Sequence, residues 1–191
     1  AADGFGKYQR GVSASIPYAV LDDSLVSYPG DTFGIIDDNN LDEFFGAADT
    51  INPENPAGPV TAVWTFDVSG AENLEISIDM GAMGDFEADD IFEWTVSIDG
   101  GPAESVFLNS VDEAGSQTYT LAGGASFTLN DPMLVDGVLL NNVLQTFTKS
   151  ISGSGSELTL TLSLQTNGSD EGIAFQNIII VGIINFLKIT D

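Results

Sequence analysis

Acidic residues crowd together in the stretch GDFEADDIFEWTVSIDGG, which covers residues 84–101. It contains Asp85, Glu87, Asp89 and Asp90 just before an apolar run. Like charges this close repel one another unless a cation lies among them. Calcium prefers hard oxygen ligands such as carboxylates, and side chains at alternate positions of an extended or looped backbone can point the same way. The stretch therefore predicts a calcium site.

A second acidic stretch supplies further candidate ligands. Asp37 and Asp38 lie in GDTFGIIDDNNLDEFFG, residues 30–46, and Asp22-Asp23 is a weaker candidate. The first stretch is not an EF-hand, because it lacks the Gly and the Glu that the calcium loop needs at its sixth and twelfth positions. The alternative is that all these acids simply face solvent. The predicted metal ligands are Asp37, Asp38, Asp85, Glu87, Asp89 and Asp90.

The chain contains neither cysteine nor histidine. This excludes disulfides, thiol nucleophiles, the usual zinc sites and acid–base chemistry by imidazole. No Gly-rich phosphate loop ending in Gly-Lys-Ser or Gly-Lys-Thr occurs. Paired carboxylates could serve glycoside hydrolysis, but a cluster of many acids lacks the mixed surroundings that tune one carboxyl as the acid. We expect no enzymatic activity.

The net charge is extreme, at −25 from 29 acidic and 4 basic residues. Such a surface repels nucleic-acid backbones and anionic membranes, so we expect neither nucleic-acid binding nor membrane insertion. The charge is most simply explained by solubility in a salty medium, and divalent-cation binding is compatible with that explanation. The chain begins Ala1-Ala2-Asp3 without Met, as a secreted product does after signal-peptide removal. We expect an extracellular or cell-surface location.

Apolar and polar residues alternate along much of the chain, which is the pattern of half-buried strands. The clearest case is ELTLTLSLQTNG, residues 157–168, where Leu recurs at every second position. Residues 60–70, 74–80 and 92–98 repeat the pattern, and residues 116–131 resemble a hairpin. Such strands need a second sheet to cover their apolar face. We predict one all-β domain over residues 1–191, an antiparallel, jelly-roll-like β-sandwich with a loop-rich acidic N-terminal region.

The two ends of the chain depart from this pattern. Residues 1–15 form a predicted N-terminal arm, and residues 183–191 a predicted apolar extension. The apolar residues from Ile178 to Val181 are consecutive, which favours a central strand buried on both faces. Alternatively, the segment after Gly182 pairs with a neighbouring subunit, since an uncovered apolar edge favours association. The predicted subunit contacts are Lys7, Arg10, Ile183, Ile184, Phe186 and Leu187.

Four phrases of the sequence carry a resemblance to a known module. They are LDDSLVSYPGDTFGIIDDNNLDEFFG, VTAVWTFDVSGAENLEISIDMGAMGDFEADDIFEWTVSIDGG, VDEAGSQTYTLAGG and AFQNIIIVG. Together they resemble a β-sandwich accessory module of large secreted bacterial proteins, including extracellular nucleases of the endonuclease/exonuclease/phosphatase type. The resemblance implies a secreted, non-catalytic domain. The catalytic motifs of those nucleases are not found in this chain, so nuclease activity is not implied.

These observations favour a secreted, calcium-stabilised structural protein that self-associates into a surface layer, matrix or filament. The expected partner is another copy of the chain, in a homo-oligomer or polymer. The alternative is a carbohydrate-binding accessory module of a secreted enzyme or adhesin, with extracellular polysaccharide as its partner. Both tryptophans fall on predicted inward faces. The remaining candidates for ligand contact are Tyr8, Tyr18, Tyr28 and Phe33.

Overall fold

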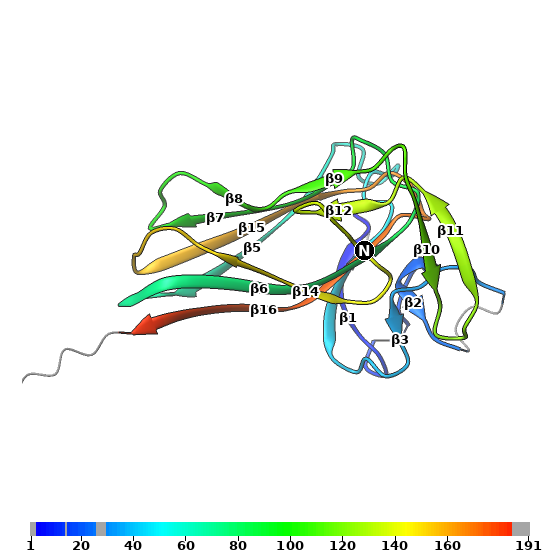
Figure 1. The fold of residues 1–191 in the computed structure, drawn as a ribbon, viewed down its shortest axis with the longest axis horizontal. Coiled ribbons are helices and arrows are strands. Elements are labelled where there is room, and N and C mark those ends of the chain that lie inside the picture. The colour runs from blue at the N-terminus through cyan, green and yellow to red at the C-terminus, as the bar shows by residue number, and fades with distance from the viewer. Residues whose placement is uncertain (1–2, 14, 26–29, 185–191) are drawn as a thin grey trace, which may run out of the picture.

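The computed structural model describes residues 3–13, 15–25 and 30–184, which form two facing antiparallel sheets (Figure 1). One sheet has the strand order β1 (Phe5–Gln9), β4 (Glu43–Ala47), β16 (Gly172–Ile184), β6 (Ala71–Met83) and β14 (Gln145–Ser150). The other has the order β5 (Val60–Asp67), β15 (Glu157–Gln165), β7 (Ile91–Ile98) and β8 (Glu104–Phe107). The predicted antiparallel β-sandwich with a jelly-roll-like form is confirmed.

Shorter elements lie at one end of the sandwich. They are the 3-10 turn η1 (Ala19–Leu21), the parallel pair β2 (Asp22–Asp23) and β3 (Ile36–Asp37), the hairpin β10 (Ser116–Thr120) and β11 (Ser126–Asn130), and the strands β9 (Asn109–Val111), β12 (Met133–Val135) and β13 (Val138–Leu139). We call β2, β3, β10, β11 and their connecting loops the end lobe (Figure 1). The hairpin predicted over residues 116–131 is confirmed, with Ser116 opposite Asn130.

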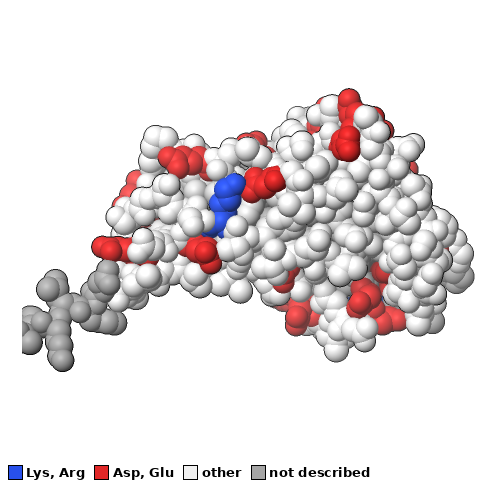
Figure 2. Space-filling view, viewed as in Figure 1, with Lys and Arg blue, Asp and Glu red and all other residues white. Residues whose placement is uncertain are grey.

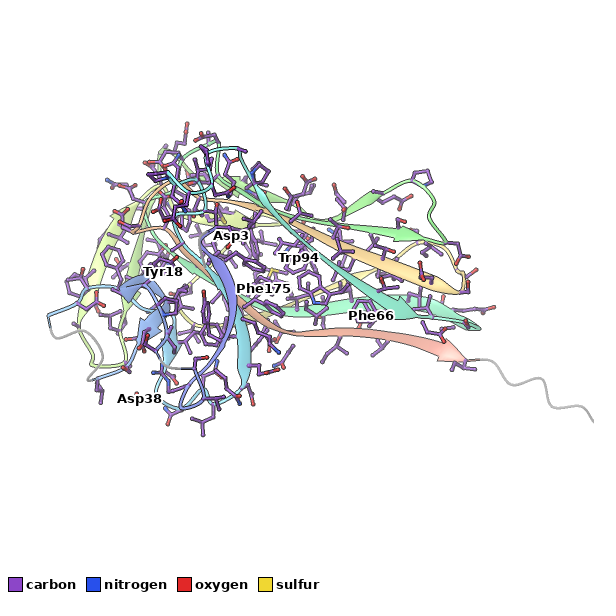
Figure 3. The ribbon with its side chains drawn as sticks, turned by 180° about the vertical axis from the view of Figure 1, so that it is seen from behind. Asp3, Tyr18, Asp38, Phe66, Trp94 and Phe175 are labelled. Atoms are coloured by element: carbon purple, nitrogen blue, oxygen red, sulfur yellow. The ribbon has the colours of Figure 1, made fainter. Side chains whose placement is uncertain are left out.

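The core between the sheets consists of the alternating apolar residues that the sequence pattern predicts to face inward. Every second residue of β15 from Leu158 to Leu164 is fully buried. Both tryptophans lie in this core as predicted, with their ring centroids 5.7 Å apart. Trp94 also meets Phe175 edge to face, with a centroid separation of 4.9 Å, and Figure 3 shows the two side chains between the sheets. Burial of such large aromatic surfaces is the main stabilising contribution here.

The last strand changes character along its length. Residues 173–175 of β16 lie between β4 and β6 and are fully buried, as a central strand requires. Beyond Gln176 the strand pairs only with β6 among the described residues. Ile179 and Val181 are about half exposed there, at 50% and 51%. The prediction of burial on both faces is therefore wrong for this half, because Ile178 and Ile180 pack against the core while Ile179 and Val181 on the other face are exposed.

One sequence expectation about the chain ends needs correction. Ile183 and Ile184, assigned to an extension, continue β16 and pair with Glu72 and Ala71. Phe186 and Leu187 lie outside the described residues. Residues 43–47 form the strand β4, which lies between β1 and β16. No helix among the described residues is long and apolar enough to cross a membrane.

Candidate metal centre and polar groove

Two loops that are far apart in sequence run side by side at one end of the sandwich. The β6–β7 loop follows Met83, which lies opposite Gly172, the first residue of β16. The same loop ends at Ile91, which lies opposite Gln165, the last residue of β15. The β6–β7 and β15–β16 connections therefore both cross between the sheets at this end.

Three carboxylates meet where these loops touch. Each of Glu87, Asp90 and Glu171 places an oxygen within 4.8 Å of an oxygen of the other two. Asp90 and Glu171 are both only 3% exposed, whereas Glu87 lies at the surface. This group, which we call the acidic centre, includes two of the residues predicted from the sequence, Glu87 and Asp90. It adds Glu171, which sequence reasoning missed.

Backbone amides fix the orientation of both buried carboxylates. The Glu87 N–H donates to Asp90 Oδ2 at 2.8 Å. The N–H groups of Asn167 and Gly168 donate to Glu171 Oε2 at 2.9 and 2.7 Å. Asp90 Oδ1 is buried and has no hydrogen-bond partner among the described residues. An unpartnered buried oxygen is energetically costly, so Asp90 Oδ1 calls for a ligand.

Glycines allow the loops to approach this closely. A Cβ at Gly168 would lie 2.3 Å from Glu171 Oε1, and a Cβ at Gly84 would lie 2.8 Å from Glu171 Cα. Neither position can carry a side chain without displacing a neighbour. The buried Glu171 side chain therefore depends on the absence of side chains at both loop positions.

Burial dominates the electrostatics of the acidic centre. It raises the pKa of Asp90 to about 6, with the nearby charges of Glu87 and Asp89 adding to the effect. Burial likewise raises the pKa of Glu171 above its ordinary value, and Asp90 contributes to this through charge repulsion. Each raised pKa means that the site disfavours uncompensated negative charge. A proton or a cation would relieve this.

The remaining ligands predicted in the first acidic stretch lie outside the acidic centre. Asp85 instead lies near the carboxylates of Asp131 and Asp170. Burial, together with these two negative charges, raises the pKa of Asp85. Asp89 is exposed, and its carbonyl oxygen accepts a hydrogen bond from Gln165 Nε2 at 2.8 Å.

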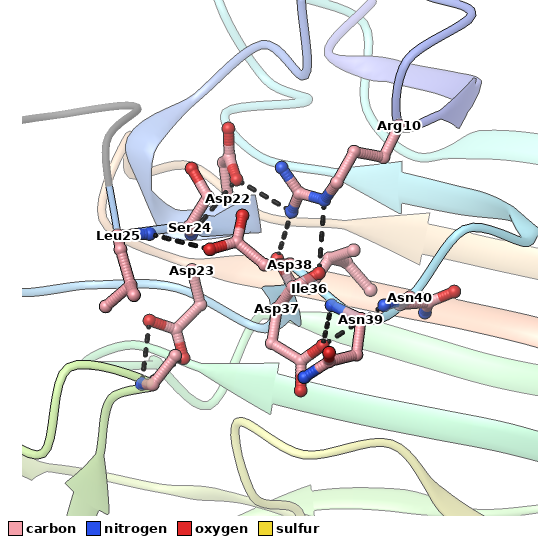
Figure 4. A network of polar contacts seen from close by, with 11 residues as sticks. Arg10, Asp22, Asp23, Ser24, Leu25, Ile36, Asp37, Asp38, Asn39 and Asn40 are labelled. Carbon is pink, nitrogen blue, oxygen red and sulfur yellow. Dashed lines mark hydrogen bonds and ion pairs between the residues drawn. The ribbon is translucent and has the colours of Figure 1, made fainter.

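In the second acidic stretch, side chains bind the chain's own backbone (Figure 4). Asp37 Oδ1 accepts from the N–H groups of Asn39 and Asn40 at 2.7 and 3.1 Å. Asp38 Oδ2 accepts from the Leu25 N–H at 3.3 Å. These contacts shape loops of the end lobe. Neither residue belongs to a group of three converging carboxylates among the described residues.

Two bases predicted at subunit contacts have partners within the chain. Arg10 Nη2 lies 2.8 Å from Asp22 Oδ1, and its Nε donates to the Asp37 carbonyl at 3.1 Å (Figure 4). The Arg10 side chain is only 17% exposed, and its contacts connect β2 and β3 of the end lobe. Lys7 Nζ lies 2.9 Å from Glu43 Oε1 at the surface.

A polar groove forms where the outer face of the five-stranded sheet meets the end lobe. Its volume is about 310 Å³. Figure 2 shows acidic side chains gathered on the side of the molecule where β2 and β3 lie. Thr120 and aliphatic residues, among them Ile35 and Val143, form the rest of the groove wall. The polar side chains that line the groove are Asp23, Asp37, Asn40, Asp79, Asn142 and Gln176.

Hydrogen bonds hold several of these groups in place. Asn40 Nδ2 donates to Gln176 Oε1 at 3.0 Å, which links the end lobe to β16. Asn177 Nδ2 donates to Asp79 Oδ2 at 2.8 Å on the sheet. Asp23 accepts from the Ala122 N–H with both oxygens, at 2.9 and 3.1 Å. The groove wall is therefore built before any ligand arrives.

Of the aromatic residues predicted as ligand contacts, Tyr8, Tyr18 and Phe33 do not line this groove. Tyr8 packs on Phe44 with ring centroids 5.8 Å apart. Tyr18 and Phe33 pack against a second apolar cluster, which is formed by residues of the end lobe and of the five-stranded sheet, and Tyr28 lies outside the described residues. Their main role in the described structure is packing.

No protein-family model and no curated protein matches the chain. A solved structure described as "CBM4 structure and function" aligns with 96% of this chain and 97% of its own chain, at 12% sequence identity and a TM-score of 0.31. That score is too low for the likeness to carry an argument about function. The functional conclusions below therefore depend on the geometry of the acidic centre, the groove and the sheets.

Proposed function

We propose that the protein is a non-catalytic binding module of the extracellular space, and that its polar groove binds a neutral saccharide. One observation supports this most directly: three carboxylates and three side-chain amides line a single groove. Its volume of about 310 Å³ lies at the lower end of the range for small-molecule sites.

The chemistry of the groove selects for hydroxyl groups. Carboxylates accept hydrogen bonds, and amides both accept and donate them. The ligand must therefore offer many O–H donors and some acceptors. An anionic ligand is disfavoured, since Asp23, Asp37 and Asp79 face the same space. Aliphatic groups such as Val143, which is 60% exposed, suit the C–H faces of a sugar ring.

The proposal includes no catalytic step. Glycoside hydrolysis needs two carboxyl groups on either side of the scissile bond. Asp90 and Glu171 are close together and have raised pKa values, but each is only 3% exposed. A glycosidic bond cannot enter between them without opening both loops.

Isothermal titration calorimetry with neutral and acidic oligosaccharides tests the groove. We expect binding of a neutral oligosaccharide and none of an acidic one. Asn40→Ala and Gln176→Ala should each weaken binding about tenfold, which is the effect of losing one hydrogen bond. Thr148→Ala on the neighbouring strand β14 lies outside the groove and should bind normally. Equal affinities for all three variants, or equal binding of acidic oligosaccharides, would reject the groove as the site.

A second candidate function, self-association, is supported by a different observation. Residues 177–184 of β16 contain no charged side chain and pair only with β6 among the described residues. Ile179, Val181, Ile183 and Ile184 are 50–56% exposed along this segment. A strand edge with free backbone groups and apolar side chains is a template for pairing with another chain.

The neighbouring cavity strengthens the case for self-association. It has a volume of about 220 Å³ and lies between β16 and β5, with Phe66, Leu74 and Ile180 in its wall. We propose that β16 of a second copy pairs antiparallel with this edge. In such a two-fold contact, each copy presents the same uncharged strip to the other. The strip itself carries no carboxylate, although the chain has a net charge of −25 and Glu72 and Glu75 lie opposite the strip on β6.

A further inference from the structure

The acidic centre contains the described buried carboxylate oxygen that most clearly calls for a ligand. Asp90 Oδ1 is unpartnered among the described residues, in a side chain that is 3% exposed. The other Asp90 oxygen is already held by the Glu87 N–H. Asp90 therefore lies beside Glu87 and Glu171 with Oδ1 left without a donor among the described residues.

We propose that Glu87, Asp90 and Glu171 bind one calcium ion. This site is independent of the polar groove, which is lined by different residues. The donor set contains oxygen alone, which suits calcium and magnesium and does not suit the metals that prefer nitrogen or sulfur ligands. Calcium takes six to eight oxygens in flexible geometry, so three carboxylates from two loops and added water can satisfy it. Magnesium requires a near-ideal octahedron and is expected to bind more weakly.

The burial pattern gives the ion a route into the acidic centre. Asp90 and Glu171 form the closed inner side, whereas Glu87 lies at the surface. Water and calcium can therefore exchange on the Glu87 side without unfolding the loops. An extracellular calcium module commonly has a dissociation constant of about 10⁻⁴–10⁻³ M, and we expect a value in this range.

A bound ion would connect two crossovers of the sandwich. Glu87 and Asp90 belong to the β6–β7 loop, and Glu171 belongs to the β15–β16 loop. These loops join the same pair of sheets, so the ion would tie the layers together at one end. It would act as a staple in a chain that has no cysteine for a disulfide. Calcium should therefore raise the melting temperature, because it binds the folded state.

Calorimetric titration of the chelator-treated protein with calcium chloride, at constant ionic strength, tests the site. We expect one saturable event, and a melting temperature that rises with calcium. Asp90→Asn and Glu171→Gln should each weaken binding at least tenfold. The matched control is Asp89→Asn, which removes an adjacent exposed charge and should bind calcium normally. Magnesium at the same concentration should give a smaller thermal shift.

Glu87→Gln keeps the test valid if the buried variants fail to fold. Glu87 is exposed, so this variant should retain the circular dichroism spectrum of the wild type while binding calcium more weakly. The proposal is overturned if calcium produces no saturable heat with the wild-type protein. It is also overturned if Glu87→Gln binds as tightly as Asp89→Asn, because the calcium ion would then be held without Glu87.

Discussion

Within the end lobe, Asp23 links β2 to the β10–β11 hairpin at the expense of burying a charge. Both of its oxygens accept from the Ala122 N–H, and the residue is 8% exposed. Burial raises its pKa to about 6, against the lowering effect of the Ala122 hydrogen bond. Asp37, Asp22 and Asp31 raise the pKa further through charge repulsion. The folded state therefore holds this proton more tightly than the unfolded chain does.

This difference predicts how stability depends on pH. Between the unfolded pKa of about 3.9 and the folded pKa of about 6, the native state binds more protons, so stability falls as pH rises. Asp23→Asn removes this penalty. The variant should match the wild type near pH 4 and exceed it near pH 7 by up to about 3 kcal/mol in free energy of unfolding. Urea denaturation at both pH values measures this.

The control for this experiment is Asp42→Asn, at an exposed carboxylate in the same part of the chain. Its stability should follow the wild-type pH curve closely. If Asp23→Asn also runs parallel to the wild type between pH 4 and 7, burial of Asp23 does not affect its ionisation in the way described.

Residue-level reasoning found only part of the acidic centre. Local spacing was enough to suggest Glu87 and Asp90, since both lie in one short acidic loop. Glu171 lies in NGSDEG, another acidic turn, and nothing near it in sequence points to Asp90. The pairing of Gly172 with Met83 brings it there, and this requires knowledge of the sheet order. Asp37 and Asp38 also lie in a short acidic stretch, but in the structure they accept hydrogen bonds from backbone amides.

At the scale of elements, alternation predicted the strands that have one face on the core. Strands β5, β6, β7 and β15 show this pattern because each meets the opposite sheet on one side. Strands β1 and β4 were not recognised. Their sequences FGKYQ and EFFGA do not alternate clearly, and they become strands by pairing with each other and, for β4, with β16. Tertiary context decides such short segments.

Residues 177–184 of β16 form the edge through which we propose that the protein self-associates. If it pairs with a second copy, Ile179→Lys combined with Val181→Lys should abolish the association, because edge lysines block strand pairing. Val63→Lys on β5 is the matched control, as Val63 is equally exposed at 59% but lies on the other sheet. Sedimentation velocity over a concentration series should show dimers or larger species for the wild type and for the Val63→Lys control. The double variant should remain monomeric.

Two other outcomes of the sedimentation experiment would lead to different conclusions. A wild-type protein that stays monomeric at all concentrations contradicts self-association through the β16 edge. Loss of association in the Val63→Lys control would instead place the contact on the outer face of β5. The bulges after Gln176 and Val181 bend the strand, so the paired segment should be short.

For the whole molecule, the net charge lowers the stability of the fold and opposes the association of two copies. A charge of −25 on 191 residues makes long-range repulsion a general destabilising effect. The described ion pairs of Lys7, Arg10 and Lys149 each neutralise one acidic neighbour and leave most of the charge uncompensated. General screening and specific calcium binding should therefore act separately on stability.

These two effects can be separated by measurement. In chelator, sodium chloride should raise the melting temperature of the wild type steadily, with the gain levelling off toward about 1 M, where the Debye length is about 3 Å. Calcium added at constant ionic strength should raise it further. Asp90→Asn should keep the sodium chloride response and lose the calcium response, because it leaves most of the net charge unchanged while disrupting the acidic centre. If calcium stabilises this variant as much as the wild type, the cation acts by screening the acidic surface as a whole.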